Sequence, residues 1–273
     1  MNNVEYRSTI LRIQNVSLSL GGNRILSDVN ADIRDIDRPN QVTGQVVALL
    51  GPSGIGKTRL FRIIAGLDEP DTGSVLVGEA QVPVRRGMVG VVAQNYPLFP
   101  HRTVLGNLKI AGLRSGLNRD LAARKADDWL ERFGLRGCGG KYPFQLSGGQ
   151  RQRAAIAQQF MCSEHFLLMD EPFSGLDPMA VENVCELIGE LANAHTLNTI
   201  IVVTHDIASA IAVSDTLWLM GRDSNGDGSL IPGAKVRATY NLIERGLTWR
   251  RDIAATPEFM DLHREIRERF RLL

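Results

Sequence analysis

The first part of the chain alternates hydrophobic and polar residues. Val16, Leu18 and Leu20 are separated by serines, which is the period-two pattern of a half-buried strand. Gly21-Gly22 then predicts a turn back into a second strand. We expect this second strand to end in a solvated loop at residues 35–41, where charged residues and a proline follow one another.

A different pattern follows, in which apolar runs alternate with helical segments. The continuous run at 46–50 predicts a buried parallel strand, and the four apolar residues at 166–169 predict another. Because strands and helices alternate, we expect an α/β fold with a mostly parallel sheet. Further strands are expected at 74–77, 88–93 and 200–204, and helices at 57–64, 180–192 and 207–213.

Between about residues 96 and 160 the pattern becomes helical, which predicts a separate lobe inserted into the sheet domain. Asn118 is a suitable N-cap for one of these helices. Glycines in the segment 134–140 are expected to end that helix. Its apolar face is predicted to hold Leu121, Ala122, Ala126, Trp129, Leu130 and Phe133.

The segment after residue 220 has a different character. Asn225-Gly226 and Asp227-Gly228 are dipeptides typical of hairpin turns. Thr256-Pro257 predicts an N-cap and first residue of a last helix. We therefore divide the chain into residues 1–220 and 221–273. The last helix carries an apolar stripe, so it either docks on its own domain, which we favour, or binds a partner.

Composition narrows the class of protein. The formal net charge is +1, so nothing in the overall charge points to nucleic acid as a partner. No apolar run approaches the roughly 18 residues that span a bilayer, and no leader peptide is visible, so we expect a cytoplasmic location. The three cysteines lack metal-ligand spacing and fit a reducing compartment.

A glycine-rich turn joins the buried strand at 46–50 to the helix at 57–64. In such loops, backbone N–H groups and the N-terminal end of the helix face phosphates. Lys57 would reach the β- and γ-phosphates, and the Thr58 hydroxyl would contact magnesium. The cofactors expected are ATP and Mg²⁺. The loop reads Gly51, Pro52, Ser53, Gly54, Ile55, Gly56, Lys57 and Thr58.

Two acidic residues follow the apolar run at 166–169. Asp170 comes at the carboxyl end of the strand, where ligands of open α/β sheets gather. It can hold magnesium through water, while Glu171 can polarise an attacking water molecule. An acid after a strand is a weak signal by itself, and it becomes strong beside the phosphate loop.

Four further motifs follow in a fixed order. They are Gln94 after a strand, the signature Leu146-Ser147-Gly148-Gly149-Gln150, Asp177 after the acidic pair, and His205 after the strand at 200–204. With these motifs, residues 10–220 resemble the ATP-binding (nucleotide-binding) subunits of ABC transporters. The resemblance implies a P-loop NTPase of the ABC cassette type. Its parts would be a mostly parallel core sheet, an antiparallel β subdomain and a helical signature subdomain at about 96–160, followed by a C-terminal hairpin and tail helix.

The resemblance also implies a role for each motif. Glu171 and His205 would be catalytic, with His205 bonding a γ-phosphate oxygen. Thr58, Gln94 and Asp170 would serve the metal, and Arg59 and Gln94 would join the phosphate loop in binding ATP. The signature would hold the γ-phosphate of ATP on a second cassette, because an anion site at a helix start outside its own phosphate loop suits a partner chain. Asp177 would lie at the dimer seam.

Three positions depart from the family pattern. Leu20 stands where an aromatic ring usually stacks on adenine, so that contact is weaker or comes from elsewhere. Arg59 replaces a small hydroxyl residue, and Gln158 replaces an arginine after the signature helix. Lys57 and both catalytic candidates remain, so we expect an active ATPase.

The function implied is that of an ATP-hydrolysing subunit of a membrane transporter, driven by closure of two cassettes. A lone cassette resembles bacterial importers of the nitrate, sulfonate and bicarbonate group or of polar amino acids. It would lie at the cytoplasmic face of the inner membrane with permease subunits and a solute-binding protein. Residues 96–100 either dock the permease or pack between the lobes. The alternatives are an ATPase acting on nucleic acid or ribosomes, and a non-hydrolysing regulatory cassette.

Overall fold

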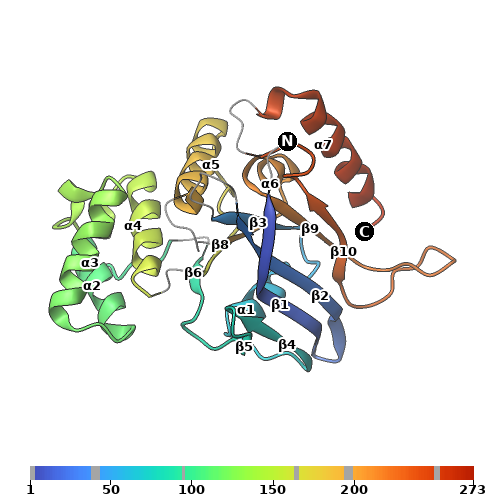
Figure 1. Cartoon of the computed structure of the whole chain (residues 1–273), viewed down its shortest axis with the longest axis horizontal. Helices are drawn as coiled ribbons and strands as arrows, with labels where there is room; N and C mark the ends of the chain where they lie inside the picture. The colour runs from blue at the N-terminus through green and yellow to red at the C-terminus, as the bar shows by residue number, and fades with distance from the viewer. Residues whose placement is uncertain (1–3, 38–43, 94–95, 163–165, 194–198, 249–252) are drawn as a thin grey trace.

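A four-stranded antiparallel sheet is built around the hairpin at the start of the chain (Figure 1). The computed structural model describes residues 4–37, 44–93, 96–162, 166–193, 199–248 and 253–273. Within these ranges the sheet has the order β2-β1-β4-β5. Gly21 and Gly22 form the turn between β1 and β2 with φ angles of 56° and 82°, as the pattern predicted. The strands are β1 (Glu5–Leu20), β2 (Asn23–Asp37), β4 (Thr72–Val77) and β5 (Val82–Pro83).

The second sheet has the order β10-β9-β3-β8-β7-β6. Five of these strands run parallel, and only β10 pairs with its neighbour β9 in the antiparallel sense. Every residue of β3 and β8 is buried, which explains their continuous apolar sequences. The strands are β3 (Gln45–Leu50), β6 (Gly90–Val92), β7 (Phe166–Asp170), β8 (Thr199–Thr204), β9 (Thr216–Gly221) and β10 (Lys235–Asn241). The expected α/β fold, with a mostly parallel core sheet and a separate antiparallel β part, is confirmed.

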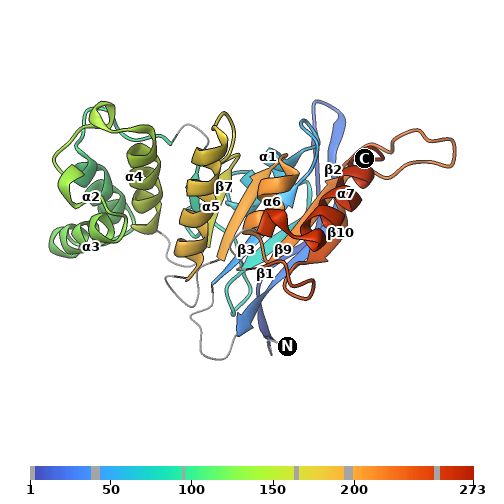
Figure 2. The same ribbon diagram turned by 90° about the horizontal axis from the view of Figure 1, so that it is seen from above.

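Some of the helices pack against the sheets, and others form a lobe to one side of them (Figures 1 and 2). The sheet helices are α1 (Lys57–Ile64), α5 (Pro178–Asn193) and α6 (Ile207–Val213). The lobe contains α2 (Val104–Arg114), α3 (Arg119–Arg132) and α4 (Gly148–Phe160), with short 3-10 helices at Arg136–Cys138 and Pro143–Gln145.

An aromatic cluster holds the helical lobe together. The Trp129 ring lies 4.7 Å from the Phe160 ring, measured between centroids, and Phe133 contacts both. Asn118 caps α3 by accepting a hydrogen bond from the backbone N–H of Leu121, as predicted. The placement of Leu121 on the apolar face was wrong, because its side chain is 50% exposed.

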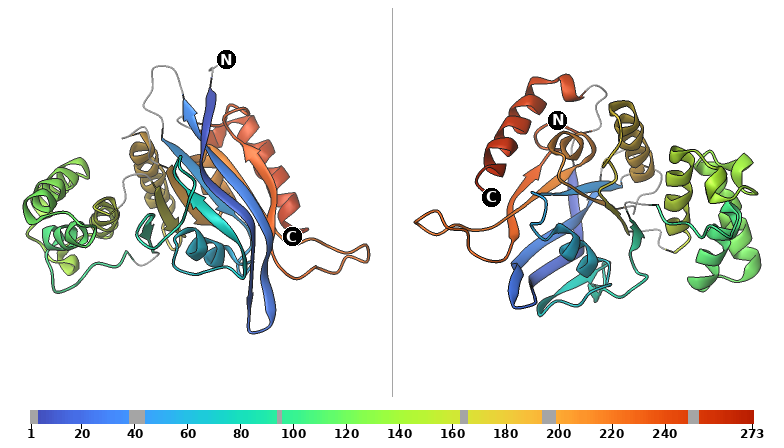
Figure 3. Two further views of the ribbon diagram at one scale, coloured as in Figure 1. Left: turned by 60° about the horizontal axis from the view of Figure 1, so that its bottom comes forward. Right: turned by 180° about the vertical axis from the view of Figure 1, so that it is seen from behind.

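The last helix, α7 (Pro257–Phe270), follows a 3-10 turn at Ile253–Ala255. The Thr256 hydroxyl accepts from the N–H of Phe259 and caps it. Phe259, Leu262 and Ile266 are buried in a core shared with α6, β9 and β10. The helix therefore docks on its own chain, as favoured. The loop between β9 and β10 projects from the body and turns at residues 225–228 (Figure 3). The division at residue 220 stays a prediction.

Two features differ from the sequence expectations. Residues 35–37, predicted as loop, continue β2, because Ile36 and Asp37 pair with Tyr6 and Glu5 of β1. The rest of that predicted loop, 38–41, lies outside the described residues. The short strand β5 had no sequence signal. In the described part of the chain, every helix is too short or too polar to cross a membrane.

Candidate functional site

The turn between β3 and α1 has a backbone that requires glycine. Gly54 and Gly56 adopt φ angles of 78° and 110°, which L side chains rarely adopt. A Cβ on Gly56 would also lie 3.2 Å from side-chain atoms of Ile25 and Leu26. The loop is thus pressed against the start of β2, and it leads directly into the first turn of α1, where backbone N–H groups attract anions.

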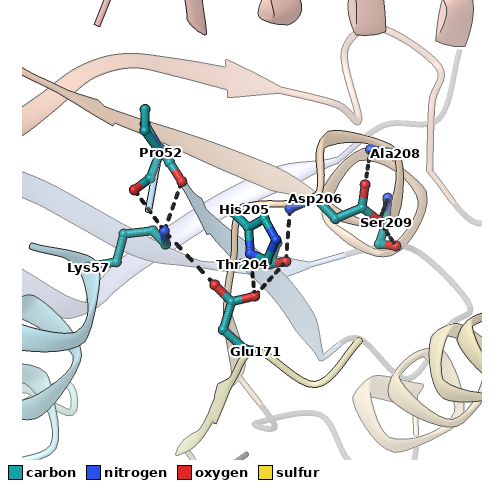
Figure 4. Close-up of polar contacts among 9 residues, drawn as sticks. Pro52, Lys57, Glu171, Thr204, His205, Asp206, Ala208 and Ser209 are labelled. Carbon is teal, nitrogen blue, oxygen red and sulfur yellow. Dashed lines mark hydrogen bonds and ion pairs between the residues drawn. The ribbon is translucent and has the colours of Figure 1, made fainter. Parts of the chain in front are cut away.

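Lys57 is buried beneath this loop. Its Nζ donates to the carbonyl oxygens of Gly51 at 2.8 Å and Pro52 at 3.1 Å (Figure 4). It also lies 3.9 Å from Oε1 of Glu171. Burial lowers the pKa of the Lys57 ammonium, and the nearby carboxylates of Glu171 and Asp170 oppose that shift. The ammonium is therefore fixed inside the loop, where a phosphate would meet it.

Asp170 ends β7 with one oxygen buried and unused. Its Oδ1 has no hydrogen-bond partner among the residues that the structure describes. Burial raises the pKa of this carboxyl, the neighbouring Glu171 raises it further, and Lys57 lowers it. An orphaned carboxylate oxygen is the donor that Mg²⁺ prefers, so Asp170 fits the metal.

The other proposed metal ligands differ in what the structure describes. Thr58 is exposed on the first turn of α1. Gln94 lies outside the described residues. Within the described ranges no cluster of three or more histidine, cysteine or acidic side chains could hold a metal. Mg²⁺ in nucleotide sites is commonly held by one or two carboxylates with phosphates and water, so this finding is compatible with Asp170 and Thr58.

Glu171 has the left-handed backbone conformation, with φ of 49°. Its N–H donates to the carbonyl of Val203 at 2.8 Å, which ties the end of β7 to β8. Its Oε2 lies 2.9 Å from Nδ1 of His205 and 3.4 Å from the Thr204 hydroxyl (Figure 4). The structure therefore brings Lys57, Glu171 and His205 together at the carboxyl ends of three adjacent parallel strands.

Thr204 and Asp206 hold His205 in place, a role that the sequence reasoning missed. The Thr204 hydroxyl accepts from the N–H of Asp206 at 3.1 Å. Asp206 caps α6 by accepting from the N–H groups of Ala208 and Ser209. An aspartate directly before an apolar helix is a capping signal, so this pair was open to prediction.

The signature motif lies on the helical lobe. Ser147 caps α4, with its hydroxyl accepting from the Gln150 N–H at 3.3 Å and Gln150 Oε1 accepting from the Ser147 N–H at 3.1 Å. Ser147, Gly148 and Gly149 are exposed, and Leu146 packs partly into the core. Helix α4 stands apart from α1 in both views (Figures 1 and 2). One copy of the chain therefore keeps the signature and the phosphate loop separate.

Asp177 is exposed at the start of α5, where its Oδ1 accepts from the N–H of Ala180 at 2.9 Å. Leu20, at the β1–β2 turn, is 40% exposed. Arg59 directs a guanidinium nitrogen to Asp68 at 3.6 Å, while Gln158 is buried within α4.

Residues 96–100 were expected either to dock the permease or to pack between the lobes, and different residues of the segment fit each expectation. The Tyr96 hydroxyl donates to the carbonyl of Pro172 at 3.2 Å, and burial raises the pKa of this phenol. Tyr96 and Leu98 pack against the core that joins the lobe to the sheet. Phe99 is 47% exposed and remains available for a partner.

The sequence is similar to those of ABC transporter proteins. The sequence model described as "ABC transporter" matches residues 40–174. The Fe(3+) ions import ATP-binding protein of Rhizobium etli is 38% identical over 230 residues, which are 83% of this chain and 61% of that protein. A sulfate/thiosulfate import ATP-binding protein of Rhizobium meliloti is 38% identical, covering 78% of this chain and 57% of its own length. The chain thus spans about three fifths of the length of these relatives.

Solved structures show the same likeness. The cbiO1 protein of Clostridium perfringens, part of an ABC transporter complex, aligns with a TM-score of 0.71 and 26% identity, covering 89% of this chain and 92% of that one. A dimeric ATP-binding cassette in a post-hydrolysis state, bound to ADP and Pi, aligns with a TM-score of 0.65 and 27% identity, covering 85% and 99%. The expected nitrate, sulfonate or amino-acid subtype is not confirmed, because these relatives are named for iron and sulfate. The nucleic-acid alternative gains no support from them.

Proposed function

We propose that the chain is an ATPase of the ABC family, which binds ATP with Mg²⁺ and hydrolyses it to drive an importer. The observation that carries this proposal is the contact of Lys57 and His205 with Glu171, next to Asp170, whose buried Oδ1 has no hydrogen-bond partner among the described residues. These groups surround the loop whose backbone suits phosphates.

Each residue has a definite task in the proposed reaction. The Glu171 carboxylate accepts a proton from the attacking water as general base. His205 contacts Glu171 through Nδ1, which leaves Nε2 to face a γ-phosphate oxygen, and donation from both ring nitrogens requires the imidazolium form. Lys57 balances the phosphate charge. Mg²⁺, when bound, would be held by Asp170 and Thr58, with Gln94 proposed as a further ligand, and would neutralise charge on the phosphates.

We further propose that the working unit is a pair of cassettes. Ser147 and the first N–H groups of α4 form an exposed anion site, which is separate from the phosphate loop of its own chain. In a two-copy arrangement each signature would face the γ-phosphate on the other copy, with Asp177 near the seam. The related post-hydrolysis cassette was solved as a dimer with ADP and Pi, which supports this assignment.

The membrane partner would be a separate permease, with a solute-binding protein delivering cargo, and the chain would lie peripherally at the cytoplasmic face of the cell membrane. The relatives are named for import of Fe(3+), sulfate or thiosulfate, and, for a putative protein of Salmonella typhimurium, 2-aminoethylphosphonate. We propose an importer of this general class. Its cargo would be chosen by the partner proteins.

A cavity of the helical lobe, lined from Arg102 onward and so three residues after Phe99, is the proposed contact for the permease. It has a volume of about 350 Å³ and lies between α2 and α3. Its charged lining residues are Arg102, Lys109 and Arg119, with apolar Ile110 and Leu113 between them. An apolar segment carrying an acidic side chain fits this lining, because the carboxylate would meet three cations.

Trapping the closed pair tests the proposed function. The Glu171→Gln chain should bind ATP, fail to hydrolyse it and elute as a dimer on size-exclusion chromatography, whereas the unchanged chain should stay monomeric. Turnover near the original rate in this variant would show that Glu171 is not the base, and an ATP-independent elution volume would contradict the paired arrangement.

Co-purification tests the partner. The chain expressed in its own cell should be recovered with membranes, and Arg102→Glu with Lys109→Glu should release it while ATPase activity of the isolated chain persists. Recovery with ribosomes instead would favour the nucleic-acid alternative.

A further inference from the structure

Two aromatic rings lie exposed directly before the signature. The Tyr142 and Phe144 rings are stacked with 5.9 Å between centroids and an interplanar angle of 15°. The side chain of Phe144 is 79% exposed, the largest exposure among the large hydrophobic residues that the structure describes, and that of Tyr142 is 39% exposed. Exposed apolar rings of this size commonly mark a binding surface.

The rings are held on a fixed turn. Pro143 between them is buried and begins the 3-10 helix Pro143–Gln145. The Tyr142 N–H donates to Oε1 of Gln145 at 2.8 Å, and the Gln145 N–H donates back to the Tyr142 carbonyl at 2.9 Å. Ser147 starts α4 only three residues after Phe144. The ring pair is therefore rigidly placed next to the proposed γ-phosphate contact.

Residues 20–26, the described segment that joins β1 to β2 and reaches the phosphate loop, contain no aromatic ring. Leu20 pairs with Asn23 at the β1–β2 turn, and Ile25, two residues further, packs against Gly56 of the phosphate loop. Leu20, the position at which the family resemblance expects an adenine-stacking ring, is aliphatic and 40% exposed. Leu20 offers apolar area without the flat π-face on which a purine stacks.

Other exposed aromatic side chains are not placed to fill this role. Among the described residues they are Tyr6 and Phe99. Tyr6 lies near the opposite end of β1 and its hydroxyl accepts from Asn241. Phe99 lies against His101, next to the cavity of the helical lobe.

We propose that Phe144, backed by Tyr142, stacks on the adenine of the ATP bound to the second copy of the chain. This inference rests on the proposed pairing of cassettes. In the paired arrangement Ser147 lies at the γ-phosphate of the partner's nucleotide and Phe144 lies at its base. The Phe144 ring then supplies the aromatic stacking that the aliphatic Leu20 cannot. Phe144 thereby makes closure of the pair depend on the base as well as on the phosphates.

The test uses the Glu171→Gln chain as parent and measures the ATP concentration that gives half-maximal dimer by size-exclusion chromatography with light scattering. Phe144→Leu keeps an apolar side chain and removes the aromatic face, so it should raise this midpoint about tenfold. Phe144→Trp keeps an aromatic face, so its midpoint should stay within about twofold of that of the parent. Met260→Ala, a change at an exposed apolar residue on α7, is the matched control and should leave the midpoint unchanged.

A second measurement locates the contact in the other copy. At dilutions that keep the chain monomeric, Phe144→Leu should leave the ATP Kd unchanged, because the ring does not reach the nucleotide of its own chain. A midpoint that does not move in Phe144→Leu overturns the inference, as does an equal loss of affinity in the monomer. A parent that never dimerises with ATP overturns the paired arrangement itself, and this inference with it.

Discussion

The Nδ1 atom of His205 lies 2.9 Å from Oε2 of Glu171, so the two proposed catalytic side chains contact each other directly. This contact joins the ends of β7 and β8 across one strand spacing. Glu171 reaches it from a left-handed backbone position, with φ of 49°. Such strained positions are typical of sites where a side chain must be aimed with accuracy.

Loss of the imidazole should therefore impair turnover more than binding. We expect His205→Ala to lower kcat by about 100-fold, the size of effect usual for acid–base and charge-stabilising groups. His101→Ala is the matched control, because it removes an exposed imidazole that contacts Phe99 and lies outside the site. Steady-state phosphate release measures both, and equal effects would contradict a special role for His205.

The raised pKa of Asp170 gives magnesium binding a pH dependence. The cause is burial, so the carboxyl holds its proton to a higher pH than an ordinary aspartate. Because only the carboxylate binds the metal, Mg²⁺ affinity should fall as the pH drops through this raised pKa. A titration of Mg²⁺-dependent ATP hydrolysis at several pH values measures it.

The same burial predicts a stability difference without metal. A folded-state pKa above the unfolded value means that the native state loses relative stability as the pH rises through that window. Asp170→Asn should therefore melt about 2–4 °C higher than the unchanged chain at neutral pH in EDTA. It should also lose Mg²⁺-dependent turnover, and a lower melting temperature would contradict the burial argument.

Gly56 should tolerate no side chain. Gly56→Ala adds a Cβ at a φ of 110° and 3.2 Å from Ile25 and Leu26, so we expect a loss of about 1–3 kcal/mol in unfolding free energy together with weaker ATP binding. Gly78→Ala is the comparison, with a φ of 75° and open space around it. The Gly78→Ala variant should lose stability through backbone strain alone and keep the ATP Kd of the unchanged chain. Urea unfolding and ATP titration measure the two quantities.

Docking of α7 should contribute to the stability of the whole chain. Phe259 is 4% exposed in the core shared with α6 and β10, so Phe259→Ala should cost about 3–5 kcal/mol. Met260 is the next residue on the same helix and is 56% exposed, so Met260→Ala should change the unfolding free energy by less than about 0.5 kcal/mol. Similar midpoints in urea for the two variants would mean that the helix is not docked in solution.

The three cysteines should differ in reactivity. Burial, together with nearby Asp206 and Glu182, raises the pKa of the Cys185 thiol to about 12, so the thiolate is scarce at neutral pH. Iodoacetamide at pH 8 should modify Cys162 before Cys185, because the Cys162 residue is exposed to the reagent. Partial desolvation of its thiol raises the pKa of Cys162 as well, so its labelling should still be slower than that of a free thiol. Peptide mass spectrometry gives the order directly, and early labelling of Cys185 would contradict its burial.

The sequence predicted best the strands and helices whose signals lie within the element itself. The run at 46–50 and the helix at 57–64 match β3 and α1 to within one residue, because a buried strand and a helix after a glycine turn carry strong signals. The capping residues Asn118 and Thr256 were likewise readable, since an N-cap acts on its own helix.

The misses share a physical cause, which is dependence on distant partners. Residues 35–37 have a loop-like composition, yet pairing with Tyr6 and Glu5 extends the strand. Leu121 looked apolar enough for the core, but α3 turns it to solvent. The motifs predicted which residues belong to the site, and the structure brings Lys57, Asp170, Glu171 and His205 together. Their roles stay predictions.

Lys57 has a consequence for how the loop behaves between nucleotides. Its ammonium ties together the carbonyl oxygens of Gly51 and Pro52, so the cation serves as an internal strut before any phosphate arrives. A neutral residue at position 57 would remove both the positive charge and the hydrogen bonds that hold the loop carbonyls. Weak nucleotide binding by such a variant could therefore come from a changed loop conformation as well as from the missing charge. The Lys57→Arg variant separates the two causes, because it keeps the charge and alters the hydrogen bonds to the loop carbonyls.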